Sequence, residues 1–252
     1  MSGLRIERDG TVLRVTLARP DRRNALDAEL IRELTEAFAD VGDARAVVLA
    51  GDGDAFCAGA DVEWQRASID LTYEENVQDA LRLYEMLAAI DGCPAPVVAR
   101  IQGYCLGGGC GLAACCDIAV AGDDAVFAFS EVKLGIIPAV ISPFVVARIG
   151  SGAARRYFLS GERFGPDVAQ RIGLVSEVAS VLDGAVERIV DELKTSGPAA
   201  VREAKRLVRP EPARGVDLAR LAARMRTGEE GQEGLRAFLD KREAAWRSAS
   251  SS

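Results

Sequence analysis

At its centre the chain reads Pro96-Val-Val-Ala-Arg-Ile-Gln-Gly-Tyr-Cys-Leu-Gly-Gly-Gly-Cys-Gly-Leu-Ala-Ala-Cys-Cys116. Its first part, Pro96–Ile101, is a short apolar run of the kind that forms a buried strand. Gly107, Gly108 and Gly109 then weaken any regular element, because glycine leaves the backbone unrestricted. We therefore expect a strand, a glycine loop and a short apolar helix ending at Cys116, which together are typical of an α/β protein.

The same alternation of apolar strands and amphipathic helices extends in both directions. Asp27 can cap a helix, in which helical spacing places one apolar group on a single face: Leu30, Ile31, Leu34, Phe38 and Val41. A longer helix is predicted over Tyr73–Ile90, with these residues facing inward: Val77, Leu81, Tyr84 and Leu87. Further strands are predicted at Thr11–Leu17, Ala46–Ala50, Asp117–Ala121, Val126–Phe129 and Leu174–Val178. The pattern predicts an α/β fold with a mainly parallel, helix-covered sheet.

The last quarter of the chain differs from the rest, because it predicts only helices that are charged outside and apolar along one stripe. This segment is too small to be a separate enzyme domain. We therefore expect a core over residues 1–195 and a C-terminal helical oligomerisation region over residues 196–252, with a disordered Ser-rich tail after Ala249. No internal repeat is visible in the sequence.

Composition narrows the classes of function. The 252 residues carry a net charge of -7, which disfavours binding to nucleic acid or to an anionic membrane, although arginines cluster near residues 19–23 and 202–226. No segment resembles a secretory signal or a membrane span. The six cysteines are not spaced as in disulfide-rich secreted proteins. They are interpreted as reduced, buried thiols of a cytoplasmic protein.

The chain contains no histidine. This absence excludes Ser-His-Asp and Cys-His nucleophiles, and also zinc sites with histidine ligands. No cysteine spacing indicates a metal site either, and we expect none. Any acid–base chemistry then falls to Asp, Glu, Lys, Tyr or Cys.

Two loops of small residues carry the candidate chemistry. One contains Gly107–Gly109, and the other runs over residues 51–61 and includes Ala58, Gly59 and Ala60. In both loops the backbone can approach a ligand closely, and N–H groups at a helix start point outward with a positive field. One N–H from each loop would form an oxyanion hole.

The glycine loop also fits other interpretations. The glycines can simply allow a helix to pack closely on a strand. Gly109-Cys-Gly-Leu-Ala-Ala114 also matches a dinucleotide-binding pattern, with Glu131 at about the expected distance. However, Gln102–Gly108 separates the strand from the first glycine, where the pattern requires direct succession. A phosphate-binding loop of the G-x-x-x-x-G-K-[ST] type is absent.

Together these motifs resemble the crotonase (enoyl-CoA hydratase/isomerase) superfamily over nearly the whole chain. The matching segments, in order, are Arg19–Leu26, Ala55–Asp61, Gln102–Gly109, Cys116–Ile118, Phe129–Pro138, Ala169–Val175 and Glu233–Phe238. The resemblance implies a spiral of β-β-α units with a C-terminal helical trimerisation region. It also implies an acyl-CoA thioester as substrate, a homotrimer or dimer of trimers, and no cofactor besides the coenzyme A of the substrate.

The resemblance also implies residue roles. Ala60 and Gly108 would donate the two backbone N–H groups that stabilise an enolate, and Glu131 would be the catalytic base. The implied substrate- and CoA-binding residues are Arg22, Arg23, Ala25, Ala58, Asp61, Val62, Gly107, Pro138, Phe238 and Lys241. Of these, Phe238 and Lys241 would reach CoA across a trimer contact, although simple packing is an equal interpretation of Phe238.

One position departs from the family. Hydratases of this superfamily carry a second glutamate where this chain has Gly111. With Glu131 alone, either one carboxylate performs both proton transfers in sequence, or the reaction needs only one base, as a Δ3-Δ2 isomerase does. Pro138–Phe144 and Arg155–Glu162 resemble the methylglutaconyl-CoA and isohexenylglutaconyl-CoA hydratase branch, which serves leucine and terpene breakdown. Its carboxylated acyl groups would require a cation near the acyl end.

The sequence therefore predicts an enoyl-CoA hydratase with an oxyanion hole. The alternatives are an enoyl-CoA isomerase that uses a single glutamate and, from another class, a non-catalytic acyl-CoA-binding homologue.

Overall fold

The computed structural model describes residues 2–208 and 227–248. Its strands are β1 Leu4–Asp9, β2 Val12–Leu17, β3 Ala46–Gly51, β4 Ala55–Cys57, β5 Val97–Ile101, β6 Tyr104–Leu106, β7 Ile118–Gly122, β8 Val126–Ala128 and β9 Glu177–Ala179. Its α-helices are α1 Ala28–Ala39, α2 Val62–Ala67, α3 Tyr73–Gly92, α4 Gly108–Cys115, α5 Ser142–Ser160, α6 Pro166–Arg171, α7 Leu182–Thr195, α8 Pro198–Leu207, α10 Glu229–Leu239 and α11 Ala245–Ser248. Two 3-10 turns, η1 Pro20–Arg22 and η2 Glu131–Leu134, complete the described elements.

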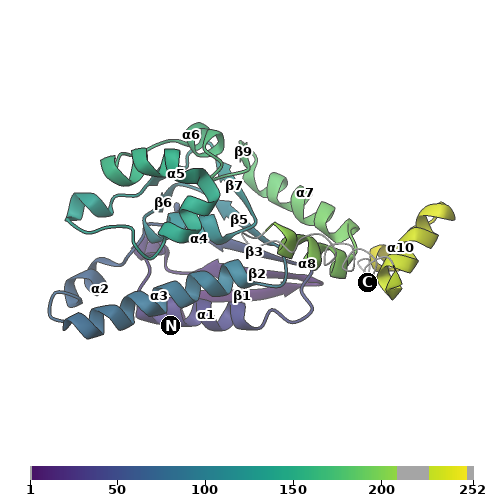
Figure 1. Cartoon of the computed structure of the whole chain (residues 1–252), viewed down its shortest axis with the longest axis horizontal. Helices are drawn as coiled ribbons and strands as arrows, with labels where there is room; N and C mark the ends of the chain where they lie inside the picture. The colour runs from purple at the N-terminus through teal and green to yellow at the C-terminus, as the bar shows by residue number, and fades with distance from the viewer. Residues whose placement is uncertain (1, 209–226, 249–252) are drawn as a thin grey trace.

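The strands form two sheets that are linked by repeated strand pairs. The larger sheet has the order β1-β2-β3-β5-β7-β9, and the smaller has the order β4-β6-β8. All neighbouring strands are parallel except β1 and β2. In each of the pairs β3–β4, β5–β6 and β7–β8, the first strand belongs to the large sheet and the second to the small sheet. A helix follows each pair in the chain. The predicted α/β fold and its β-β-α spiral are confirmed (Figure 1).

The central strands are apolar on both faces because both faces are covered. On β3, Val47 and Leu49 belong to the main core, which also contains buried residues of α1, α3 and α4. The alternate residue Val48 packs in a second core with Val186 and Val190 of α7. A single strand therefore contributes to two hydrophobic layers, which explains its continuous apolar run.

Four strands differ from the predictions. β1 lies in an N-terminal segment whose polar residues predicted no strand, and it pairs along the edge of the sheet with mostly exposed side chains. An edge strand tolerates charges that a central strand would not. The strands β4 and β6 were missed; each has only three residues, although the equally short β8 was predicted. The strand predicted at Leu174–Val178 begins later, as β9, while Leu174 is buried in the preceding loop.

Helix α3 was predicted correctly in extent but not in orientation. A capping box between Thr72 and Glu75 starts it, and its buried residues are Met86, Leu87 and Ile90. Three of the residues predicted to face inward are exposed: Val77, Leu81 and Tyr84. The helix is buried only along its C-terminal half, because the N-terminal half extends past the sheets beside α2 (Figure 1).

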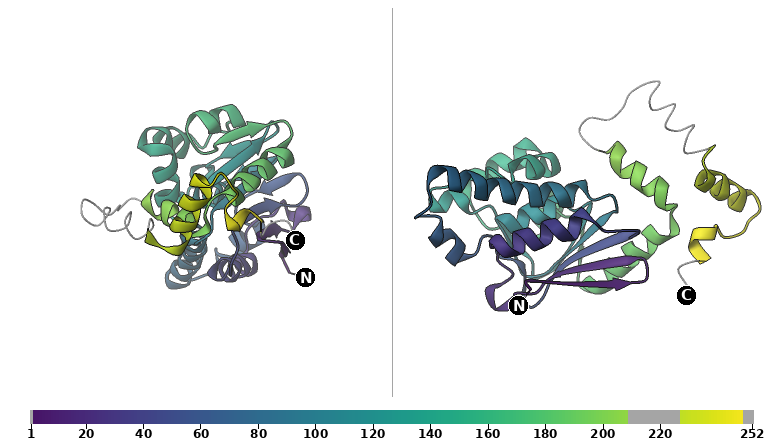
Figure 2. Two further views of the ribbon diagram at one scale, coloured as in Figure 1. Left: turned by 90° about the vertical axis from the view of Figure 1, so that its right-hand side faces the viewer. Right: turned by 90° about the horizontal axis from the view of Figure 1, so that it is seen from below.

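The C-terminal helices are attached to the core by a few polar contacts. Lys205 of α8 donates to Asp117 at 2.7 Å and to the Ala95 carbonyl at 3.0 Å. Arg45 donates to the carbonyls of Trp246 and Ser196. Helix α10 lies away from the sheets, at the end of the molecule opposite α2 (Figures 1 and 2). The predicted tail after residue 249 lies outside the described residues, and an oligomerisation role of this region stays a prediction.

No helix within residues 2–208 and 227–248 is both long and apolar enough to cross a membrane.

Candidate active site

A cavity of about 350 Å³ opens where the small sheet meets α2, η2 and the start of α5. This volume lies within the usual range for small-molecule sites, which is about 300–1,000 Å³. The lining is mostly apolar and consists of Leu26, Ala58, Gly59, Ala60, Val62, Trp64, Gln65, Leu83, Leu106, Gly107, Gly108, Ser130, Glu131, Leu134, Ile136, Ile137, Pro138, Ala139, Val140 and Ile141.

The two loops of small residues meet at this cavity. Gly59 has a φ of 92°, and a Cβ atom there would lie 2.9 Å from the Leu106 carbonyl oxygen and 3.8 Å from the Gly108 nitrogen. A Cβ atom on Gly109 would lie only 2.3 Å from the Cys57 carbonyl oxygen. The glycine loop therefore has two uses, because Gly109 lets α4 pack closely on β4 while Gly107 and Gly108 line the cavity.

The backbone around Ala60 is held by the segment that ends at Leu26. The Leu26 N–H donates to the Gly59 carbonyl at 2.7 Å, and the Asp61 N–H donates to the Leu26 carbonyl at 2.8 Å. Leu26 and Ala60 thus form an isolated parallel bridge. In this arrangement the N–H and C=O groups of Ala60, which lies between the two bonded residues, point away from Leu26. The N–H of Ala60 has no hydrogen-bond partner among the described residues, and Ala60 lines the cavity.

Gly108 supplies a second free N–H group. It is the first residue of α4, where backbone N–H groups have no intrahelical partner. The neighbouring Gly107 N–H donates to the Ala128 carbonyl at 2.8 Å, whereas the N–H of Gly108 bonds to no described residue. The field of the helix start favours negative charge at this position. Two residues with unpaired N–H donors therefore line one cavity, each from a different loop.

Glu131 provides the titratable group of the cavity. It begins η2, three positions after the last residue of β8, and a Cβ atom on Gly107 would lie 3.1 Å from its Oε1 atom. Its Oε2 atom is buried and has no hydrogen-bond partner. Burial raises the pKa of Glu131, and a hydrogen bond from its own backbone opposes this only in part. A carboxylate with one unpaired, buried oxygen and a raised pKa is suited to proton transfer.

The position of Gly111 is closed by a neighbouring side chain. A Cβ atom there would lie 2.6 Å from Cγ2 of Ile141 and 3.5 Å from Cδ2 of Leu87. Ile141 is 3% exposed and lines the cavity. The place where a second carboxylate would enter is therefore filled by an aliphatic side chain.

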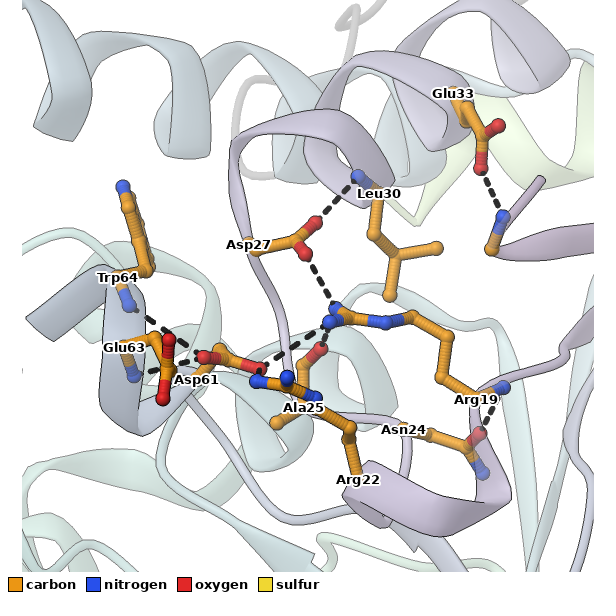
Figure 3. Close-up of polar contacts among 11 residues, drawn as sticks. Arg19, Arg22, Asn24, Ala25, Asp27, Leu30, Glu33, Asp61, Glu63 and Trp64 are labelled. Carbon is orange, nitrogen blue, oxygen red and sulfur yellow. Dashed lines mark hydrogen bonds and ion pairs between the residues drawn. The ribbon is translucent and has the colours of Figure 1, made fainter. Parts of the chain in front are cut away.

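A polar cluster around Asp61 is drawn in Figure 3, and the cleft that it lines shares Trp64 with the cavity. Asp61 caps α2 with Oδ1, while its Oδ2 atom faces Arg19 at 3.2 Å and Arg22 at 3.3 Å. Burial would raise the pKa of Asp61, but the N–H groups of Glu63 and Trp64 and the two arginines outweigh it and lower that pKa. The Asp61 carboxylate is therefore ionised at neutral pH, and both of its oxygen atoms have polar partners.

Seven predicted site residues line the cavity: Ala58, Ala60, Val62, Gly107, Gly108, Glu131 and Pro138. Arg22 and Asp61 line the adjacent cleft with Trp64 instead. Arg23 lies over the ring of Tyr104 at 5.2 Å, and Ala25 is buried.

Phe238 and Lys241 are not brought to the cavity within this chain. Phe238 lies in α10, although its side chain is outside the described set, and Lys241 is exposed just after that helix. Figure 1 places α10 far from α2. Their predicted contact with CoA across subunits stays a prediction.

Several lining residues were not predicted. Ile141 approaches Gly111 from thirty positions further along the chain, and nothing local to either residue indicates the contact. Trp64 could have been found, because it follows the predicted helix start at Asp61 by one turn. Its indole N–H donates to Asp79 of α3 at 3.1 Å.

The cysteines are free and buried, as predicted. Burial raises the pKa of Cys57 to about 12, so its thiol stays protonated at neutral pH. No group of His, Cys, Asp or Glu in the described residues is arranged to hold a metal ion.

Comparison with known proteins agrees with this geometry. The model of the Enoyl-CoA hydratase/isomerase family matches residues 7–249. The chain belongs to this family. It is 33% identical to an enoyl-CoA hydratase of Alternaria alternata over 96% of this chain and 83% of the relative.

Solved structures also match this chain almost end to end. An enoyl-CoA hydratase from Shewanella pealeana superposes with a TM-score of 0.91 at 36% identity, covering 97% of this chain and 96% of that one. AtuE of Pseudomonas aeruginosa gives a TM-score of 0.93 at 37% identity, with 97% and 99% coverage. This chain is therefore an enzyme of the crotonase superfamily.

Proposed function

We propose that this enzyme moves a proton at the carbon next to the thioester of an enoyl-CoA, with Glu131 as its single base. One observation carries the proposal: within the described lining, Glu131 is the only carboxylate, and it shares the cavity with the unpaired N–H groups of Ala60 and Gly108. Those N–H groups would hold the thioester oxygen as it gains negative charge. One such donor contributes about 10²–10³-fold in rate.

The reaction that this geometry supports best is Δ3-Δ2 enoyl-CoA isomerisation. Glu131 would take a proton from C2 of a 3-enoyl thioester, and the electron pair would move into a dienolate held by Ala60 and Gly108. The same carboxyl group would then return the proton to C4. Because Ile141 fills the place of a second carboxylate, a reaction that needs only one base fits the cavity.

Hydration is the second candidate, and the names of the relatives favour it. The protein from Shewanella pealeana, for example, is called an enoyl-CoA hydratase. In this reaction Glu131 would first take a proton from water as the oxygen attacks C3, and would then deliver that proton to C2. One carboxylate acting twice balances the reaction.

We propose an uncharged acyl chain rather than a methylglutaconyl group. The described lining contains no Arg or Lys that could pair with a distal carboxylate, and it includes aliphatic residues such as Leu83, Val140 and Ile141. The coenzyme A part would lie toward Arg22 and Val62, in a cytoplasmic trimer or dimer of trimers that needs no further cofactor. Leucine breakdown is accordingly not part of the proposal.

The test follows the absorbance of the conjugated thioester with 3-hexenoyl-CoA, crotonyl-CoA and 3-methylglutaconyl-CoA. A rise with the first substrate establishes an isomerase, and a fall with the second establishes a hydratase. Activity with the third alone would overturn the uncharged acyl group. The variant Glu131→Gln should abolish every signal, whereas Glu162→Gln, at an exposed site paired with Arg156, should retain it. Binding of these thioesters without turnover would leave the acyl-CoA-binding role and overturn the proposal.

A further inference from the structure

Two helix-capping aspartates share one arginine beside the cavity (Figure 3). Asp27 caps α1 by accepting from the Leu30 N–H at 2.9 Å, and Asp61 caps α2 by accepting from the Glu63 N–H at 2.8 Å. Each uses Oδ1 for its cap and presents Oδ2 to Arg19, at 2.8 Å for Asp27 and 3.2 Å for Asp61. Arg19 therefore ties the starts of two helices together.

Arg19 is held more firmly than an ordinary surface arginine. Its side chain is 18% exposed, and it also donates to the Ala25 carbonyl at 2.7 Å. Its backbone N–H is bonded to Asn24, which is fully buried. Arg22, the other partner of Asp61, is 46% exposed and makes a single longer contact. Of the two arginines that contact Asp61, Arg19 is therefore held in place by several further contacts, and Arg22 is not.

Asp61 follows Ala60 directly in the chain, so the contacts of Asp61 also constrain the peptide segment that carries the Ala60 N–H. The Asp61 N–H is bonded to Leu26, and its carboxylate is held by Arg19. With Gly59 bonded to Leu26 on the other side, the direction of the Ala60 N–H is determined by the residues around it. A small displacement of such a donor has a large effect, because about 1 Å of misplacement can cost about 10²-fold in rate.

We propose that Arg19 and Asp61 are positioning residues, which hold the Ala60 N–H in the direction needed for oxyanion stabilisation. This inference rests on the proposed function, because it assumes that the Ala60 N–H contacts the thioester oxygen. The pair itself does not line the cavity and acts only through the backbone of Ala60.

The two aspartates provide a matched pair of variants. Asparagine is an N-cap residue about as good as aspartate, so Asp61→Asn and Asp27→Asn each retain a cap and weaken one contact to Arg19. We expect Asp61→Asn to lower kcat at least tenfold, with KM and the Kd for butyryl-CoA, a saturated and unreactive thioester, changed less than threefold. We expect Asp27→Asn, which leaves the contact between Arg19 and Asp61 in place, to lower kcat less than Asp61→Asn does.

A purely structural network would give a different result. Equal losses of kcat in the two variants, or a loss in Asp61→Asn that appears only in KM, would overturn the inference. If Asp61→Asn does not fold, Arg19→Lys keeps the charge but loses the fork that joins Ala25 and Asp61, and its effect should again fall on kcat. Failure of the proposed function is recognised separately, because Glu131→Gln would then retain the activity of the native enzyme.

Discussion

Two walls of the cavity bury different kinds of side chain: the η2 wall, formed by Glu131 and Leu134, and the α5 wall, formed by Val140 and Ile141 directly before α5. On the η2 wall, Glu131 keeps a carboxylate with one buried oxygen that has no partner. On the α5 wall, Ile141 fills the space over Gly111. A buried, unpaired carboxylate is unfavourable for folding, whereas a close-packed aliphatic contact stabilises the fold. The difference indicates that only the η2 wall is arranged for chemistry, and that the α5 wall is arranged for packing.

The largest expected effect comes from removing the charge on the η2 wall. Replacing Glu131 by Gln should lower kcat about 10²–10⁴-fold, which is the usual contribution of a positioned acid–base group. The side chain keeps its size, so KM should change little. Steady-state kinetics with the best of the three thioesters measures both values. A loss below about tenfold would mean that another group moves the proton.

The chemistry of these walls could be predicted from the sequence better than their packing. Ala60, Gly108 and Glu131 lie in short local motifs, and the structure brings all three to one cavity. Ile141 could not be predicted, because its contact with Gly111 depends on how α5 enters the fold. Similarly, nothing local shows that Asp27 and Asp61 share Arg19.

The same limit applies to the fold. The long apolar strands of the large sheet were predicted because continuous burial leaves a clear pattern. Of the small sheet only β8 was predicted, because strands of three residues leave almost no period to detect. For α3, helical spacing correctly indicated a helix, but Val77 and Leu81 are exposed. A period cannot show how far along a helix the core extends.

The next effect concerns the α5 wall and tests its packing. Gly111→Ala should lower the free energy of unfolding by about 1–3 kcal/mol, the usual cost of overpacking, because the new methyl group meets Ile141 at 2.6 Å. Ile141→Ala removes that contact, so the cost of Gly111→Ala should shrink in its background. Urea unfolding of the single and double variants gives this coupling energy, expected at about 0.5–3 kcal/mol.

Gly152 in α5 provides the control for these variants. A Cβ atom there would meet nothing within 4 Å, so Gly152→Ala should stabilise the protein slightly, by up to about 1 kcal/mol from helix propensity. If Gly111→Ala behaved like Gly152→Ala, the α5 wall would have room for a side chain, and the contrast between the walls would fail.

The smallest expected effect is on stability and its pH dependence. Burial raises the pKa of Glu131 in the folded state, so the protonated form is the one that the fold favours. Relative to an uncharged side chain, the folded state therefore loses stability as the pH rises through that raised pKa. Glu131→Gln should have a higher Tm than the native enzyme at pH 8, and the difference should vanish near pH 4. The activity of the native enzyme should fall over the same range as the pH is lowered, because the base must be ionised. Thermal unfolding of both proteins across this pH range measures the difference. A native enzyme that is the more stable of the two at pH 8 would show that a partner compensates the charge on the η2 wall.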